Sequence, residues 1–174
     1  QYDETVVSDG ENIYLCATEN PGMQIEKRQG GRGGSVAKID FPTDSAYRAN
    51  VCATQDKGLI VAGTDGIFRR RAEADTWEKL LDGLETDFAM TDCQCAGLAV
   101  REDGSIYALF QESGGGARLN RYAYDPEAVV EIEEELHLYT VYESPLLQQA
   151  AVMYHREHPE VAITIQYAYS AYDS

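Results

Sequence analysis

The chain has few basic residues and no long apolar segment. Its 174 residues include 14 Lys and Arg against 30 Asp and Glu, which gives a formal net charge of −16. The electric field of this negative charge repels phosphate backbones and anionic lipid surfaces, so nucleic-acid and membrane-surface partners are disfavoured. The apolar stretches are too short to span a bilayer, so membrane insertion by this segment is not expected.

Cysteine is also scarce. Cys16, Cys52, Cys93 and Cys95 are too few for a scaffold built on disulfides in a chain of this length. Cys93 and Cys95 are separated by one residue, which is not the two-residue spacer of a zinc knuckle or a thioredoxin-type pair. We expect all four to be small buried hydrophobic residues, with one or two disulfides as the alternative.

The sequence begins at Gln1, without a charged and apolar leader, which predicts a mature or excised piece of a longer protein. Hydrophobic residues make up 44% of the chain and charged residues 25%, which is typical of a globular protein with a core of its own.

An internal repeat is present in the first two thirds of the chain. Residues 6–15, 53–62 and 99–108 each read as a short apolar strand, a polar turn with Asp and Gly, and a second β-rich strand. Ile13, Leu59 and Ile106 occupy matching positions, 46 and 47 residues apart. Two nearly equal offsets in this range are typical of four-stranded propeller blades.

Each unit is expected to continue with a third strand of alternating apolar and polar residues, at 35–41, 66–70 and 118–124. An outer strand is expected at 76–80 in the second unit. The glycine runs at 30–34 and 114–116 lack the Gly-Lys-Ser/Thr ending of a phosphate-binding loop, so we interpret them as hairpin loops between the second and third strands.

These units resemble β-propeller repeats over roughly residues 5–127. They lack the Trp-Asp ending of WD40 blades, and the segment 74–77 is only a remnant of the sialidase-type Asp box. The resemblance implies a mainly β fold with three four-stranded blades, an incomplete ring, because propellers use four to eight. Either more blades precede Gln1 in the parent protein, or a homodimer completes a six-blade ring.

The pattern changes after residue 127. Residues 128–135 form an acidic run that we interpret as an inter-domain linker, with a metal site as a less favoured alternative. A strand at 136–142, a helix from Ser144 to about His158 and a strand at 161–167 then predict a βαβ unit. Ser144 and Pro145 are a suitable N-cap and first helical residue.

This unit resembles the N-terminal start of bacterial extracellular solute-binding proteins, the sugar-type receptors of ABC importers. The resemblance rests on the segments Leu138–Tyr142, Ser144–His155 and Glu157–Ile163. It implies that residues 136–174 are the truncated start of such a domain, in a surface lipoprotein of the bacterial cell exterior. It also implies that the loop holding Tyr142, Glu143 and Ser144 borders a ligand cleft, with a carbohydrate or peptide solute as the partner. The alternative for Tyr142 and Ser144 is a strand-end aromatic and a helix cap.

No catalytic arrangement is recognisable, and no cofactor is expected. His155 and His158 have a spacing compatible with metal binding, but the sequence places no further ligand beside them, so we predict no metal site. The chain is therefore expected to be a non-catalytic binding module. The alternatives are a glycan-active propeller enzyme, which needs converging carboxylates, and a propeller that binds another protein.

Overall fold

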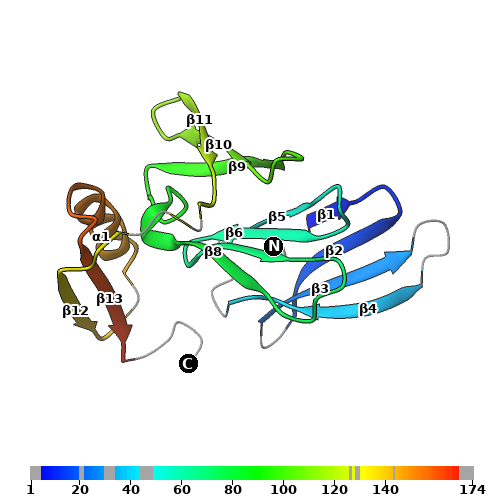
Figure 1. The fold of residues 1–174 in the computed structure, drawn as a ribbon, viewed down its shortest axis with the longest axis horizontal. Coiled ribbons are helices and arrows are strands. Elements are labelled where there is room, and N and C mark those ends of the chain that lie inside the picture. Colours follow the sequence, from blue (N-terminus) through cyan, green and yellow to red (C-terminus); the bar gives the residue numbers. More distant parts are fainter. Residues whose placement is uncertain are drawn as a thin grey trace.

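The computed structural model describes residues 5–19, 22–29, 34–43, 49–125, 127, 130–142 and 144–168. These residues form a mainly β structure with one α-helix, three antiparallel sheets and one parallel strand pair. Within the described residues, no sheet closes into a barrel. The third sheet and the parallel pair with its helix lie at the top and left of Figure 1, and the first two sheets lie to the right.

The three antiparallel sheets follow one another along the chain as simple meanders. The first sheet consists of β1 (Thr5–Ser8), β2 (Asn12–Glu19), β3 (Gly22–Gln29) and β4 (Ser35–Asp40). The second sheet consists of β5 (Asn50–Ala53), β6 (Leu59–Gly63), β7 (Gly66–Arg70) and β8 (Glu78–Asp82). The third sheet consists of β9 (Cys93–Val100), β10 (Ile106–Glu112) and β11 (Ala117–Tyr122).

The repeated segments fold as the first hairpin of each sheet, as predicted. Strands β1 and β2, β5 and β6, and β9 and β10 pair antiparallel across the turns that the sequence indicated. The turns at 54–58 and 101–105 share one pattern: the first residue's amide donates to the fifth residue's carbonyl, 2.9 Å away in both. The repeat is therefore present in the backbone as well as in the sequence.

In two of the three hairpins, the turn glycine has the positive φ angle that a tight turn needs. Gly10 and Gly104 have positive φ angles of 92° and 80°. In the middle turn, however, Lys57 has the positive φ, 64°. Gly58 is required there for space, because a Cβ at that position would lie 2.7 Å from the carbonyl oxygen of Arg70.

Three details of the blade prediction are wrong. Strand β3 was not predicted, so the strand expected third in the first unit is the fourth, β4, and the run 30–34 connects β3 to β4. Residues 30–33 of that run lie outside the described residues. The outer strand of the second sheet begins at Glu78, because Trp77 instead packs against the core and donates its indole N–H to the carbonyl of Asp40 at 2.8 Å.

The third sheet has three strands, not the four predicted, within the part of the chain that the structure describes. Asp125 and a proline follow β11 in the sequence, and both residue types have low β-propensity. The next strand, β12 (Glu134–Thr140), pairs with β13 (Val161–Tyr167) instead. Because β12 includes Glu134 and Glu135, the expected linker at 128–135 ends in a strand.

The second sheet lies between the other two. On β6, Leu59 and Val61 belong to a core shared with Tyr14 and Cys16 of the first sheet. Ile60 and Ala62 point to the opposite face and belong to a core shared with Ile106, Ala108 and Phe110 of the third sheet. All five residues of β6 are buried, so this antiparallel strand reads as a continuous apolar run because both its faces are covered.

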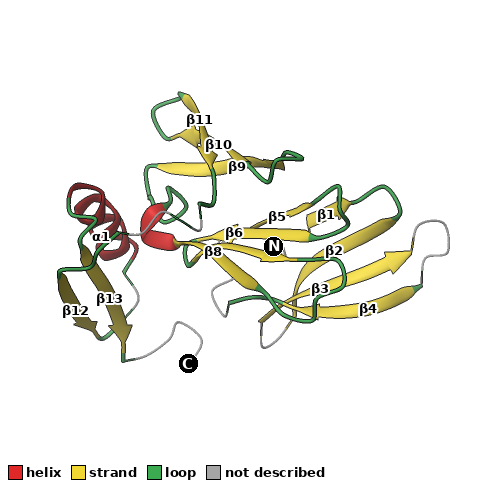
Figure 2. Cartoon of the chain, viewed as in Figure 1, coloured by secondary structure: helices red, strands yellow, loops and turns green. Residues whose placement is uncertain are grey.

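The βαβ unit forms at the predicted places. Strands β12 and β13 are parallel, and the helix α1 (Pro145–Glu157) connects them (Figure 2). Ser144 is the N-cap and accepts a hydrogen bond from the Leu147 amide at 3.4 Å, as its sequence position predicted. Helix α1 has 13 residues, and no helix in the described part of the chain has the length and apolarity needed to cross a membrane.

Asp9 organises the first hairpin. Its carboxylate accepts hydrogen bonds from the backbone amides of Glu11 and Asn12 at 2.9 and 2.7 Å and from the buried Tyr14 hydroxyl at 2.9 Å. Burial by itself would raise the pKa of Asp9, but these hydrogen bonds outweigh it and hold the pKa below its usual range. Burial and the neighbouring Asp9 raise the pKa of Tyr14 to about 12.

We expect Asp9→Ala to lower the free energy of unfolding at neutral pH by about 1–3 kcal/mol, because it leaves the Tyr14 hydroxyl without this acceptor. The folded pKa of Asp9 lies below the ordinary 3.8, so its stabilisation is present above that value. It is lost as the pH falls through the folded pKa, so wild type and variant should converge in acid. Urea denaturation at neutral and acidic pH measures this. Asp103→Ala, in the exposed turn of the third sheet, is the control and should have a smaller effect.

Candidate ligand-binding site

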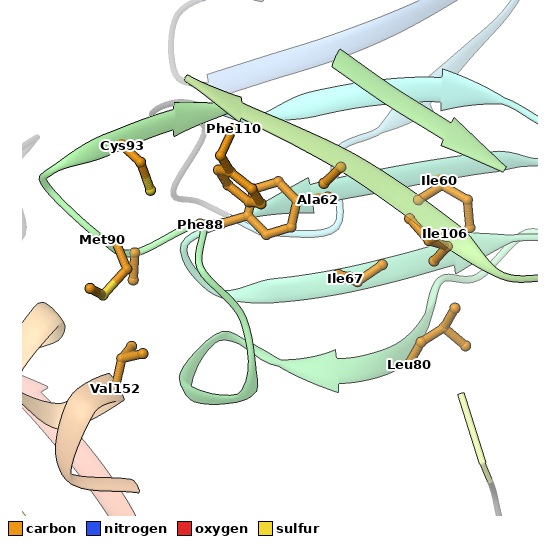
Figure 3. Close-up of a cluster of buried hydrophobic side chains, with 12 residues drawn as sticks. Ile60, Ala62, Ile67, Leu80, Phe88, Met90, Cys93, Ile106, Phe110 and Val152 are labelled. Atoms are coloured by element: carbon orange, nitrogen blue, oxygen red, sulfur yellow. The ribbon is translucent and has the colours of Figure 1, made fainter. Parts of the chain in front are cut away.

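The βαβ unit is packed against the sheets and does not stand apart from them. Val152 of α1 is fully buried in the core that also contains Met90 and Cys93. Figure 3 shows Val152 directed from the helix toward Met90, with Phe88 and Phe110 on the sheet side of the same cluster. The helix thus shares a core with the second and third sheets.

A buried carboxylate connects helix α1 to the sheets, and we call this contact region the joint. Asp87 lies between the 3₁₀ turn η1 (Gly83–Glu85) and β9, and is 5% exposed. Its carboxylate accepts hydrogen bonds from Arg156 of α1 and from the Asn120 amide of β11, and lies 3.4 Å from the Arg118 guanidinium. We call Asp87, Arg118, Asn120 and Arg156 the Asp87 cluster. It connects the loop, the third sheet and the helix through opposite charges.

A second hydrogen bond also connects the loop before β9 to helix α1. The Thr91 hydroxyl donates a hydrogen bond to the side-chain carbonyl of Gln149 in α1. The loop itself is held by η1, where Asp82 and Glu85 form a capping box. Thr86 follows, and its amide and hydroxyl both donate to the Gly83 carbonyl, at 3.1 and 2.9 Å. These hydrogen bonds hold the loop from 83 to 92, which we call the bracket, between the sheets and the helix.

A pocket of about 260 Å³ lies where the bracket, the second sheet and the βαβ unit meet. One part of its wall is apolar and consists of Leu84, Ala89, Ile163 and Ile165. The polar part comes from four elements: the β6–β7 turn, strand β8, the first turn of α1 and the end of β13. It consists of Thr64, Asp65, Lys79, Asp82, Gln148 and Tyr167.

The polar groups of this pocket are oriented by neighbouring residues. The Gln148 amide donates to the Tyr167 hydroxyl at 3.2 Å. Asp65 accepts a hydrogen bond from Thr43, and the Lys79 ammonium lies 2.8 Å from the Asp82 carboxylate. Two carboxylates, one ammonium, an amide and hydroxyls around an apolar wall can bind a small ligand that carries both hydroxyl groups and an apolar face.

The backbone makes this pocket possible at one position in particular. Gly83 lines it, and a Cβ there would overlap the Thr64 carbonyl oxygen. Any other residue would push η1 away from the β6–β7 turn. The close approach of these two segments therefore depends on glycine.

Of the residues predicted from the sequence, Tyr142 and Ser144 do not line this pocket. Tyr142 is 70% exposed, and Ser144 is engaged as the cap of α1. Glu143 lies outside the described residues. Gln148, one turn into the same helix, is the residue that reaches the pocket.

The pocket residues gave one usable signal in the sequence. Tyr167 is the last residue of the second predicted parallel strand, and ligands of α/β sheets bind at the carboxyl ends of strands. Asp65, Lys79 and Asp82 come from the second sheet, more than 60 residues earlier in the chain. No local pattern indicated that these residues meet the βαβ unit.

The two histidines of α1 make local contacts. His155 Nδ1 lies 3.1 Å from the Val161 carbonyl oxygen, and His158 Nδ1 lies 3.2 Å from a Glu160 carboxylate oxygen. In the described ranges, no three His, Cys, Asp or Glu side chains gather as they would around a metal ion.

All four cysteines are free thiols in this structure. Cys16 and Cys93 are buried, and Cys52 and Cys95 are half-buried. Burial raises the pKa of each thiol, that of Cys16 to about 11. The prediction of buried hydrophobic cysteines is therefore confirmed for Cys16 and Cys93, whereas Cys52 and Cys95 are only half-buried.

Comparison with known proteins adds no family to this picture. No family model matches the chain, and no curated protein matches it either.

Proposed function

We propose that the chain is a non-catalytic extracellular binding module of a bacterial surface lipoprotein, serving solute capture for an ABC importer. In this proposal three propeller-type blades form a scaffold, and the βαβ unit is the start of a solute-binding domain. The repeat offsets of 46 and 47 residues and the stacking of successive sheets support the blades.

The βαβ unit supports the second part of the proposal. Parallel sheets are usually buried on both faces. On β12, however, Leu136 is 40% and Tyr139 75% exposed. Such exposed apolar side chains are expected if the βαβ unit is part of a larger α/β domain whose other elements cover them.

The observation that carries the ligand class is the pocket at the joint. Its volume of about 260 Å³ is smaller than the about 300–1,000 Å³ of most drug-sized sites. It suits a single-ring ligand. Hydrogen-bonding groups that face an apolar wall match a sugar ring, which has hydroxyls at its edge and C–H groups on its faces. A monosaccharide or similar polyol is the ligand class that we propose.

Titration calorimetry of the whole chain with a panel of neutral monosaccharides tests this proposal. We expect Asp65→Asn to weaken binding about tenfold, because one charge-assisted hydrogen bond is worth about 1.5–3 kcal/mol. Asp56→Asn is the matched control, because Asp56 also accepts a hydrogen bond from a threonine hydroxyl, Thr54, but lies in a turn outside the pocket. Absence of heat with every sugar, or equal loss in the two variants, would contradict the proposal.

A glycan-active enzyme is the second candidate, because Asp65 and Asp82 are two carboxylates in one pocket. Asp82 already caps η1, accepting from the Leu84 amide at 3.2 Å, and pairs with Lys79. Such structural engagement favours binding over catalysis. Release of a chromophore from aryl glycosides, lost in Asp65→Asn and retained in Asp56→Asn, would favour the enzyme instead.

A further inference from the structure

The two outer sheets of the stack each have a face with exposed apolar side chains. On the third sheet, Leu109 and Leu119 are paired across β10 and β11 and are 41% and 63% exposed. On the first sheet, Val6 and Ile13 are 61% and 38% exposed. Val6 is paired with Leu15 across β1 and β2, so apolar side chains adjoin on this face too.

The two interfaces inside the chain use opposite faces of successive sheets. The first sheet presents Tyr14 and Cys16 of β2 to the second sheet. By the repeat, the equivalent residues of the second sheet are Ile60 and Ala62, and these face the third sheet. We call this the forward face of a sheet.

The opposite faces of the sheets follow the same repeat. The second sheet receives the first with Leu59 and Val61, and the third sheet receives the second with Ile106 and Ala108. The matching residues of the first sheet are Ile13 and Leu15. We call this the rear face.

What remains exposed is therefore one face of each kind. The third sheet's forward face, with Tyr107 and Leu109, and the first sheet's rear face, with Ile13 and Leu15, have no sheet of this chain stacked on them in the described residues. A forward face packs on a rear face in both existing interfaces, so the two exposed faces are complementary in kind.

From this continuity we infer that a second copy of the chain docks head to tail, with its first sheet's rear face on the third sheet's forward face. Repeating the contact in the other direction closes two copies into a ring of six sheets. Six lies within the four to eight that closed propellers use. The interface is heterologous, and closure distinguishes a ring from an open filament.

Charge opposes this association at long range. Each copy has a formal net charge of −16, so the two copies repel each other at low ionic strength. Salt screens this repulsion, while apolar contacts between the faces persist. The pairing should therefore strengthen as salt is added, which is opposite to an association driven by ion pairs.

Sedimentation equilibrium of the whole chain at increasing salt tests the inference. We expect the mass to double with concentration, and the dissociation constant to fall as salt rises. Val6→Glu on the rear face and Leu119→Glu on the forward face should each raise the dissociation constant at least about tenfold. Leu146→Glu is the matched control, because Leu146 is 73% exposed on α1, away from both faces, and should change nothing.

A mixing experiment isolates the head-to-tail geometry. A Val6→Glu chain keeps an intact forward face and a Leu119→Glu chain keeps an intact rear face, so their mixture retains one good interface and should pair better than either alone. Circular dichroism verifies that both variants are folded. A monomer at every concentration, an open series of larger species, or pairing that Val6→Glu leaves unchanged would overturn the inference. Sugar binding in the pocket is measured independently of this mass.

Discussion

Phe110→Ala should lower the free energy of unfolding by about 3–5 kcal/mol, the usual range for truncating a buried aromatic residue. Phe110 is fully buried, and its ring lies 5.1 Å from that of Phe88 in an edge-to-face arrangement. The Arg118 guanidinium lies 6.0 Å from the centre of the same ring. The truncation opens a cavity where the second sheet, the third sheet and the bracket meet, and sheets on both sides hold its walls in place.

Urea denaturation monitored by circular dichroism measures the loss. Leu109→Ala is the control, because Leu109 is the adjacent residue of β10 and points to the opposite, exposed face. At concentrations where the chain is monomeric, the control should lose less than about 1 kcal/mol. A loss of the same size in both variants would mean that the shared core does not hold the third sheet.

Asp87→Ala should be the second large effect, with a loss of about 2–3 kcal/mol. Removing one partner of a fully buried ion pair costs about 3–5 kcal/mol, because the other charge is left without compensation. Here the arginines are only partly buried: the side chains of Arg118 and Arg156 are each 43% exposed. Both can turn toward water after the substitution, which reduces the loss.

The location of the effect is as informative as its size. Because Asp87 connects α1 to the third sheet, the variant should exchange the amide hydrogens of α1 faster than wild type. Arg156→Met removes only the contact from the helix, so it should loosen α1 and leave the exchange of β10 unchanged. Helix exchange equal to wild type in Asp87→Ala would show that Val152 and its neighbours hold the joint without the ionic cluster.

Local sequence patterns were sufficient to predict the elements whose conformation depends on their own residues. The helix was predicted from Ser144 to about His158 because Ser144 and Pro145 are a start signal, and it spans Pro145–Glu157. The strand at 161–167 is short, apolar and β-branched, and its bounds agree with the prediction. The three hairpins were recognisable because Asp and Gly turns recur at nearly constant spacing.

Local patterns failed where pairing or packing decides. Strand β3 was missed because most of its residues are polar or charged; Ile25 is its fully buried anchor. In the described residues the third sheet lacks its expected fourth strand, because the next strand, β12, pairs with β13 instead. The site at Tyr142, Glu143 and Ser144 was predicted from a resemblance and stays a prediction; the described Tyr142 and Ser144 do not line the pocket.

Turns, caps and strand alternation depend on residues close together in the chain, so the mainly β character, the repeated hairpins and the capped βαβ unit could be predicted from local patterns. The stacking of the sheets, with the second between the others, depends on contacts between distant segments. The tertiary structure also decided that Asp87 meets Arg156, and that Asp65 and Lys79 share a pocket with Gln148 and Tyr167. These groups are separated by up to about 100 residues, and no period or spacing encodes such a meeting. Burial of the apolar faces is what brings them together.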